Sequence, residues 1–323
     1  MSESLLSIEN LSVGFTTERG SVTAVRGVSL SVAAGETLCL VGESGCGKSV
    51  TCHAVLRLLP KNGRVSGGRI LFEGRDLAAL PERELERLRG REIAMIFQDP
   101  LTALNPVHSI GKQLAEVLVL HRGLSWRAAT AEAKRLLDRV RIPDAGRRIG
   151  EYPHQLSGGM NQRVAIAMAM ACRPKLIIAD EPTTALDVTI QAQILELIRE
   201  LQAEEGLALM LVTHDLGVVA EMADRVAVMY LGRVAEEAEV GDLFAAPAHP
   251  YTRGLLRSIP RIDTNVVRLA TIEGSVPSLH AVPLGCPFAP RCENACTACG
   301  ESLPEPQTRT GGRRVACFAP VAA

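Results

Sequence analysis

Apolar positions in the first 240 residues alternate between short continuous runs and stretches with helical spacing. Short β-rich stretches predict strands over 5–15 and 22–32, and more continuous apolar runs predict strands over 37–41, 176–179 and 207–213. Helical spacing predicts helices over 48–59, 110–121, 126–140 and 189–204, and a hairpin over 225–236 that turns at Leu231-Gly232. Strands that alternate with helices indicate an α/β sheet, here with a helical insertion at about 100–158.

Beyond residue 241 the periodicity fades and proline becomes dense. This change predicts a smaller, irregular C-terminal region over 241–323, after a larger domain over 1–240. We expect this region to be held together by something other than a large apolar core.

Composition narrows the class of protein. The chain has 323 residues, of which 47% are hydrophobic, so it can bury a real core. A net charge of −1 and an aromatic content of 3% give no support for a nucleic-acid partner. Apolar runs stay shorter than the roughly 18–20 residues of a membrane span, and the first residues do not resemble a secretory signal. We therefore expect a cytosolic chain.

A glycine-rich segment, Gly42–Ser49, fits the phosphate-loop pattern G-x-x-x-x-G-K-[ST] between a predicted strand and a predicted helix. Such a loop turns its backbone N–H groups and the helix N-terminus toward phosphates. Lys48 would then reach the β- and γ-phosphates of a nucleotide, and Ser49 would bind Mg²⁺. A glycine-rich turn without a ligand is the alternative that this context disfavours. The candidate ATP-binding residues are Gly42, Ser44, Gly45, Cys46, Gly47, Lys48, Ser49 and Val50.

Two carboxylates end the apolar run 176–179. Asp180 at the tip of this strand would bind Mg²⁺, directly or through water, and Glu181 would polarise the attacking water. A strand that simply runs into solvent is the alternative, and a preceding phosphate loop makes it weaker.

A second anion site is predicted where Ser157, Gly158 and Gly159 begin a helix. One nucleotide does not need two such sites on one chain, so we expect this segment to complete a nucleotide pocket on another subunit. By itself the segment would be an ordinary helix N-cap.

Together these motifs resemble the nucleotide-binding subunit of an ABC transporter. The phosphate loop, Leu156–Met160, Asp180-Glu181, Ala185-Leu186-Asp187 and His214 stand in that family's order. The resemblance implies two subunits that close head to tail around two ATP molecules. It also implies that Gln98 links Mg²⁺ to the membrane subunits, that Asp187 lies at the dimer contact, and that His214 contacts the γ-phosphate. Phe15 matches an aromatic that stacks on adenine, although a core phenylalanine is an equal alternative.

Three further segments resemble the ATPases of dipeptide and oligopeptide importers: Phe97–Pro106, Asp180–Asp187 and Ala248–Thr252. That resemblance implies a peripheral ATPase at the cytoplasmic face of the membrane. Its implied partners are a paralogous ATPase subunit, two transmembrane permease subunits and an extracytoplasmic substrate-binding protein. A homodimer, a nickel or glutathione importer, and a soluble ABC ATPase of iron–sulfur assembly are the alternatives.

Five of the nine cysteines crowd into the C-terminal region: Cys286, Cys292, Cys296, Cys299 and Cys317. In a reducing compartment such a cluster indicates metal ligation, and four thiolates suit zinc or an iron–sulfur cluster. The importer resemblance implies a [4Fe–4S] cluster on Cys286, Cys292, Cys299 and Cys317, with Cys296 as an extra. Zinc and metal-free thiols are the alternatives.

Overall fold

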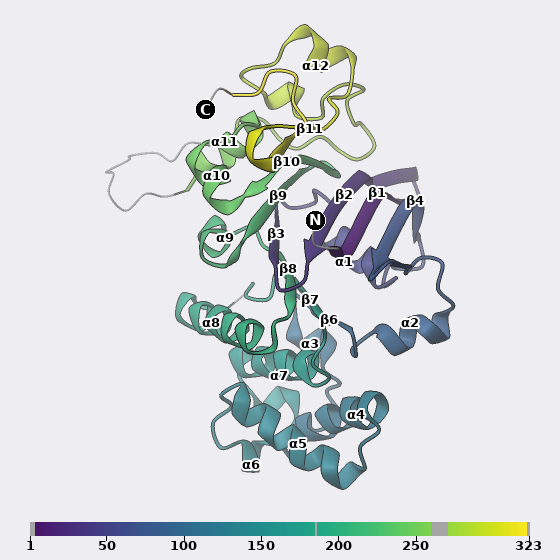
Figure 1. Cartoon of the computed structure of the whole chain (residues 1–323), viewed down its shortest axis with the longest axis vertical. Helices are drawn as coiled ribbons and strands as arrows, with labels where there is room; N and C mark the ends of the chain where they lie inside the picture. The colour runs from purple at the N-terminus through teal and green to yellow at the C-terminus, as the bar shows by residue number, and fades with distance from the viewer. Residues whose placement is uncertain (1–3, 185, 260–270, 322–323) are drawn as a thin grey trace. The chain divides into compact units, whose positions relative to one another are not determined.

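Two compact units make up the chain, and each is assembled from separate stretches. The first unit comprises Met1–Leu5, Val32–Glu36 and Ala79–Val212, and the second comprises Leu6–Ser31, Thr37–Ala78 and Thr213–Ala323. The computed structural model describes residues 4–184, 186–259 and 271–321, so Ala185 of the predicted motif lies outside it. Figure 1 shows the elements of both units.

Most residues of an antiparallel sheet in the order β2-β1-β4-β5 belong to the second unit. Its strands are β1 (Ser4–Thr17), β2 (Gly20–Ala33), β4 (Gly63–Phe72) and β5 (Arg75–Asp76). Buried apolar residues of β1 alternate with more exposed, mostly polar ones, as a half-buried strand requires. The strands predicted over 5–15 and 22–32 are confirmed.

The second unit also contains five strands in the order β11-β12-β10-β9-β3. They are β3 (Thr37–Val41), β9 (Arg225–Tyr230), β10 (Arg233–Glu239), β11 (Gln307–Thr308) and β12 (Arg314–Val315). Strands β3 and β9 are parallel, whereas β9 and β10 form the predicted hairpin. Leu231 and Gly232 turn it with φ of 45° and 80°, the two positive values that a type I′ turn needs.

Three parallel strands form the centre of the first unit: β6 (Ile93–Ile96), β7 (Leu176–Asp180) and β8 (Ala208–Val212). Every residue of β7 and β8 is buried, which explains their continuous apolar runs. Helix α7 (Gly158–Met170) packs against β6 and against α8 (Val188–Glu205).

A helical segment precedes α7 in the first unit. It contains α3 (Pro100–Ala103), α4 (Ile110–Arg122), α5 (Trp126–Arg139) and α6 (Ala145–Arg148). Helices α4 and α5 pack side by side and both contact α7 (Figure 1). Ser109 and Ser125 cap their N-termini, so the helices begin where the spacing predicted.

Helix α1 (Lys48–Val55) is shorter than the predicted 48–59, because Arg57 adopts a left-handed φ of 52°. The segment after it leads to α2 (Glu82–Leu88). In the part of the chain that the structure describes, no helix is long and apolar enough to cross a membrane.

Short elements follow β8 and β10: α9 (Leu216–Met222), α10 (Val240–Ala245), α11 (Pro250–Arg257), η2 (Ala289–Arg291), α12 (Thr297–Glu301) and η3 (Thr310–Gly312). The one-turn helix η1 (Pro153–Gln155) stands before α7. Four ring side chains hold the C-terminal region to the hairpin: Tyr230, His249, Tyr251 and Phe288.

His249 is a buried, neutral member of this ring cluster. Its Nδ1 accepts a hydrogen bond from the backbone N–H of Tyr251 (3.0 Å) and caps α11. Its own backbone N–H donates to the fully buried carboxylate of Glu236 (2.8 Å). Burial lowers the pKa of His249 to about 4, against an opposing hydrogen bond with the backbone of Ala316.

This burial predicts a pH-dependent stability. A histidine in the unfolded chain has a pKa of about 6.5, so the unfolded state binds more protons than the folded state between pH 6.5 and about 4. The contribution of neutral His249 to the free energy of unfolding is complete above pH 6.5. It falls by about 3 kcal/mol as the pH drops to about 4. His249→Asn keeps a capping oxygen that does not titrate. Urea unfolding at several pH values should give the variant a flatter profile, and parallel profiles would contradict the prediction.

Candidate functional site

The phosphate loop lies between β3 and α1, in the second unit. Gly42, Gly45 and Gly47 have φ of 147°, 79° and 102°, which side-chain-bearing residues rarely adopt. A Cβ at Gly42 would lie 2.2 Å from the carbonyl oxygen of Met229, and one at Gly47 would lie 2.8 Å from that of Ala24. The glycines therefore satisfy both conformation and space.

Lys48 is the first residue of α1 and is only 5% exposed. Its Nζ donates to the carbonyl oxygens of Gly42 (2.8 Å) and Glu43 (3.2 Å), so the loop backbone holds the ammonium group. Burial raises the pKa of the Cys46 thiol, although Lys48 opposes the rise. Cys46 is therefore a lining residue of the loop and not an activated nucleophile.

Of the other predicted loop residues, Ser44 and Gly45 are exposed, whereas Ser49 and Val50 are half-buried. The loop turns back on itself, since the backbone N–H of Cys46 donates to the carbonyl oxygen of Glu43 (3.3 Å). The hairpin turn supports it, because the N–H of Gly232 donates to the carbonyl oxygen of Cys46 (2.9 Å).

Two more predicted residues belong to the second unit. The backbone N–H of Thr213 donates to the carbonyl oxygen of Leu40 (3.3 Å), so the exposed His214 follows directly beside the end of β3. Phe15 lies on β1 opposite Gly63 of β4, and a Cβ at Gly63 would come within 2.6 Å of its ring. The ring of Phe15 thus covers a glycine and is half-buried.

The predicted carboxylates belong to the first unit. Asp180 ends β7 and is 4% exposed. Glu181 follows with a left-handed φ of 47°, a conformation that non-glycine residues adopt uncommonly. Its Oε2 accepts hydrogen bonds from Nε2 of Gln98 (3.2 Å) and Oγ1 of Thr184 (2.9 Å). The structure therefore brings Gln98 and Glu181 together, although they are 83 positions apart.

The predicted signature segment begins α7. Oγ of Ser157 accepts a hydrogen bond from the N–H of Met160 (3.3 Å) and caps the helix. A Cβ at Gly159 would lie 2.7 Å from Cγ2 of Ile190, so the close approach of α8 requires glycine there. Asp187 is exposed and caps α8 by accepting from the N–H of Ile190 (3.0 Å).

The cysteines of the C-terminal region come close enough to affect one another. Burial raises the pKa of Cys317 to about 11, and three further thiols add to the rise: Cys286, Cys292 and Cys299. The Sγ atoms of Cys296 and Cys299 lie 3.5 Å apart. Among the described residues, however, no group of three or more His, Cys, Asp or Glu side chains is arranged to hold a metal ion. The ligand set that the importer resemblance implies is not preformed among the described residues, and the thiol pair at 3.5 Å includes Cys296, which that resemblance leaves out.

Sequence reasoning missed the contacts that reach the phosphate loop from the C-terminal region. The guanidinium of Arg291 forms a two-pronged ion pair with the carboxylate of Glu43, at 2.6 and 3.0 Å. The backbone N–H of Glu43 donates to the hydroxyl of Tyr251 (2.9 Å). These partners are more than 200 positions apart, and no spacing rule connects them.

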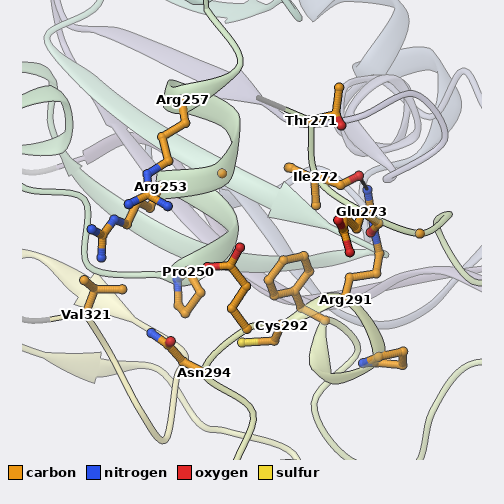
Figure 2. A pocket seen from close by; sticks show the side chains of 15 residues that line it. Pro250, Arg253, Arg257, Thr271, Ile272, Glu273, Arg291, Cys292, Asn294 and Val321 are labelled. Atoms are coloured by element: carbon orange, nitrogen blue, oxygen red, sulfur yellow. Dashed lines mark hydrogen bonds between the residues drawn. The ribbon is translucent and has the colours of Figure 1, made fainter. Parts of the chain in front are cut away.

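An open pocket of about 560 Å³ lies in the C-terminal region and not at the phosphate loop. Figure 2 shows Arg253 and Arg257 of α11 on one side and Ile272, Glu273 and Arg291 on the other. Cys292 also lines it, so the pocket borders the cysteine cluster.

Comparisons with known proteins identify the class. The family model of the ABC transporter matches residues 25–184, and that of the oligopeptide/dipeptide transporter C-terminal region matches residues 235–299. The ATP-binding cassette MJ0796, solved as a dimer in a post-hydrolysis state with ADP and Pi, is 28% identical with a TM-score of 0.66. The match covers 73% of this chain and 98% of that one. The fold is that of an ATP-binding cassette.

Two curated relatives narrow the family. The dipeptide transport ATP-binding protein DppD of Bacillus subtilis is 53% identical over 98% of this chain and 95% of its own length. The oligopeptide transport ATP-binding protein OppD of Salmonella typhimurium is 52% identical over 98% of this chain and 94% of its own. The chain belongs to the family of ATP-binding proteins of dipeptide and oligopeptide ABC transporters.

Proposed function

We propose that this chain is the ATP-hydrolysing subunit of an ABC importer for dipeptides or oligopeptides. The phosphate loop carries the proposal: its ammonium group is held inside a backbone turn in which only glycine fits at two positions. Similarity to peptide-transport ATP-binding proteins over nearly the whole chain supports the substrate class. Import of nickel or glutathione is the second candidate, and an ATPase of iron–sulfur assembly the third.

In this function the phosphate loop binds the nucleotide. The ammonium of Lys48 contacts the β- and γ-phosphates, and loop N–H groups surround them. Phe15 stacks on the adenine. Mg²⁺ would be held by the oxygens of Ser49, Gln98 and Asp180, a hard donor set that suits this ion, and it would neutralise phosphate charge.

Glu181 positions the attacking water in the same proposal. Hydrogen bonds from Gln98 and Thr184 to Oε2 fix the orientation of its carboxylate. A carboxylate fixed in this way accepts a hydrogen bond from water and aligns its lone pair with the γ-phosphorus. His214 contacts the γ-phosphate.

A second ATPase subunit completes each site. The helix N-terminus at Ser157, Gly158 and Gly159 supplies N–H groups to the nucleotide held by the partner, and Asp187 lies at the dimer contact. We propose a paralogous chain as that partner. Two permease subunits and an extracytoplasmic substrate-binding protein complete the importer, with this chain peripheral at the cytoplasmic face of the membrane.

Each part of the chain has its own role in this proposal. Residues 1–240 form the ATPase domain, and the helical subdomain at about 100–158 transmits closure to the permeases. Residues 241–323 carry the four thiols proposed to hold a [4Fe–4S] cluster: Cys286, Cys292, Cys299 and Cys317. Zinc is the alternative, and either metal would tie this proline-rich region together.

Glu181→Gln should stop turnover without stopping ATP binding. An amide keeps the shape of the side chain but is too weak a base to align the water, so kcat should fall by about 100-fold or more. The variant should also accumulate an ATP-bound dimer, which gel filtration with Mg-ATP detects. Glu200→Gln is the matched control, because Glu200 is an exposed carboxylate paired with Arg141. Normal turnover of Glu181→Gln would contradict the role of Glu181.

The cysteine cluster is tested by metal analysis of the protein purified without oxygen. About four irons and four acid-labile sulfides per chain are expected. Ser substitution of any of the four proposed ligands should remove them, because each thiolate binds one iron. Cys296→Ser is the matched control and should retain them. One zinc per chain would establish the alternative, and a metal-free chain would contradict both.

A further inference from the structure

Residues of the C-terminal region bind the phosphate loop at Glu43. The carboxylate of Glu43 pairs with both Nη atoms of Arg291, and its backbone N–H donates to the hydroxyl of Tyr251. Glu43 is the second residue of the loop, and its carbonyl oxygen accepts from Nζ of Lys48 (3.2 Å). One residue thus connects the phosphate-binding lysine to the C-terminal region.

The Arg291 side chain is buried and fixed by several hydrogen bonds, unlike an exposed side chain in a surface ion pair. It is 4% exposed, against 29% for Glu43. Its remaining donors are also used, since Nε donates to the carbonyl oxygen of Glu273 (3.0 Å) and Nη2 to that of Ile272 (3.3 Å). Figure 2 shows Arg291 beside Ile272 and Glu273. A planar guanidinium with this many fixed partners has little freedom to release Glu43.

Tyr251 fixes the same residue from a second direction. Its side chain is fully buried, and its ring packs against Tyr230 (centroids 4.7 Å apart) and Phe288 (5.3 Å). Phe288 directly precedes the η2 turn that ends at Arg291. The two anchors therefore share one packed cluster, and displacement of η2 would affect both.

The negative charge of Glu43 makes its contacts with the C-terminal region relevant to the binding of a nucleotide. An unpaired carboxylate in a phosphate loop would repel the triphosphate. The two-pronged pair with Arg291 neutralises that carboxylate and draws it toward the C-terminal region. We infer that Arg291 and Tyr251 are positioning residues for ATP, through which the C-terminal region sets the conformation and charge of the phosphate loop. This inference rests on the proposed ATP binding by that loop.

A double-mutant cycle on ATP affinity tests the inference in the full-length chain. Arg291→Ala should raise the Kd for Mg-ATP about tenfold, a coupling typical of residues in one ion-pair network. Adding Glu43→Ala should restore much of the affinity, because it removes the repelling carboxylate. The loss should shrink as salt rises, since ions screen the repulsion. Additive effects of the two substitutions, or a loss that salt does not change, would overturn the electrostatic role.

Three further variants complete the test. Tyr251→Phe removes only the hydroxyl that accepts from Glu43 and should weaken ATP binding severalfold. Arg291→Lys keeps the charge without the two-pronged geometry and should recover part of the affinity. Arg69→Ala is the matched control, because it breaks the exposed pair with Glu9 in the same unit and should bind ATP normally.

Thermal unfolding and the ATP affinity of the wild type distinguish a misfolded variant, a failure of the proposed function and a failure of the inference. Thermal unfolding identifies variants that lost affinity through misfolding, and the double substitution keeps the test valid because it should bind better than Arg291→Ala alone. Wild-type binding is measured first. A wild-type chain that does not bind Mg-ATP would overturn the proposed function, and with it the inference. A wild type that binds, with Arg291→Ala and Tyr251→Phe binding equally well, would overturn the inference alone.

Discussion

The close approach of backbone to backbone around the phosphate loop is the constraint on which the rest of the site depends. A Cβ at Gly42 would overlap the carbonyl oxygen of Met229, and one at Gly47 would crowd that of Ala24. Glycine at these positions lets the loop turn tightly enough for Lys48 to bond to two of its carbonyl oxygens. The loop backbone therefore fixes the ammonium group, and a group fixed in this way loses little conformational freedom when it binds a ligand.

In the first unit, the segment that follows β7 is also held in one conformation. Glu181 adopts a left-handed backbone and receives hydrogen bonds from Gln98 and Thr184. Strain of this kind costs about 1–3 kcal/mol, and only a well-packed surrounding retains it. The continuous burial of β7 and β8 provides that surrounding. The carboxylate of Glu181 is thus held by two hydrogen bonds and follows a fully buried strand.

Much of this could be predicted from the sequence, and the exceptions have a common cause. Apolar periodicity located β3, α4 and α5 because those elements follow local rules, and the Leu231-Gly232 turn carries its own conformational signal. Helix α1 ends early because Arg57 takes a left-handed φ, which no pattern announces.

Long-range pairs were beyond such rules. The contact of Arg291 with Glu43 joins positions 248 residues apart, and neither residue type predicts the other. The importer resemblance implied four ligands, whereas the structure pairs Cys296 with Cys299 and presents no metal-ready group among the residues described. Spacing reports which thiols are available, but the fold decides how far apart they lie.

The most direct test of the account is titration of the chain with Mg-ATP, for the wild type and for Lys48→Ala. We expect the wild type to bind Mg-ATP and the loss of the ammonium group to weaken binding by at least about tenfold, because a charge-assisted contact to phosphate disappears. Lys61→Ala, which removes an exposed lysine, serves as the control and should bind like the wild type. Equal affinities for the wild type and Lys48→Ala would contradict the account.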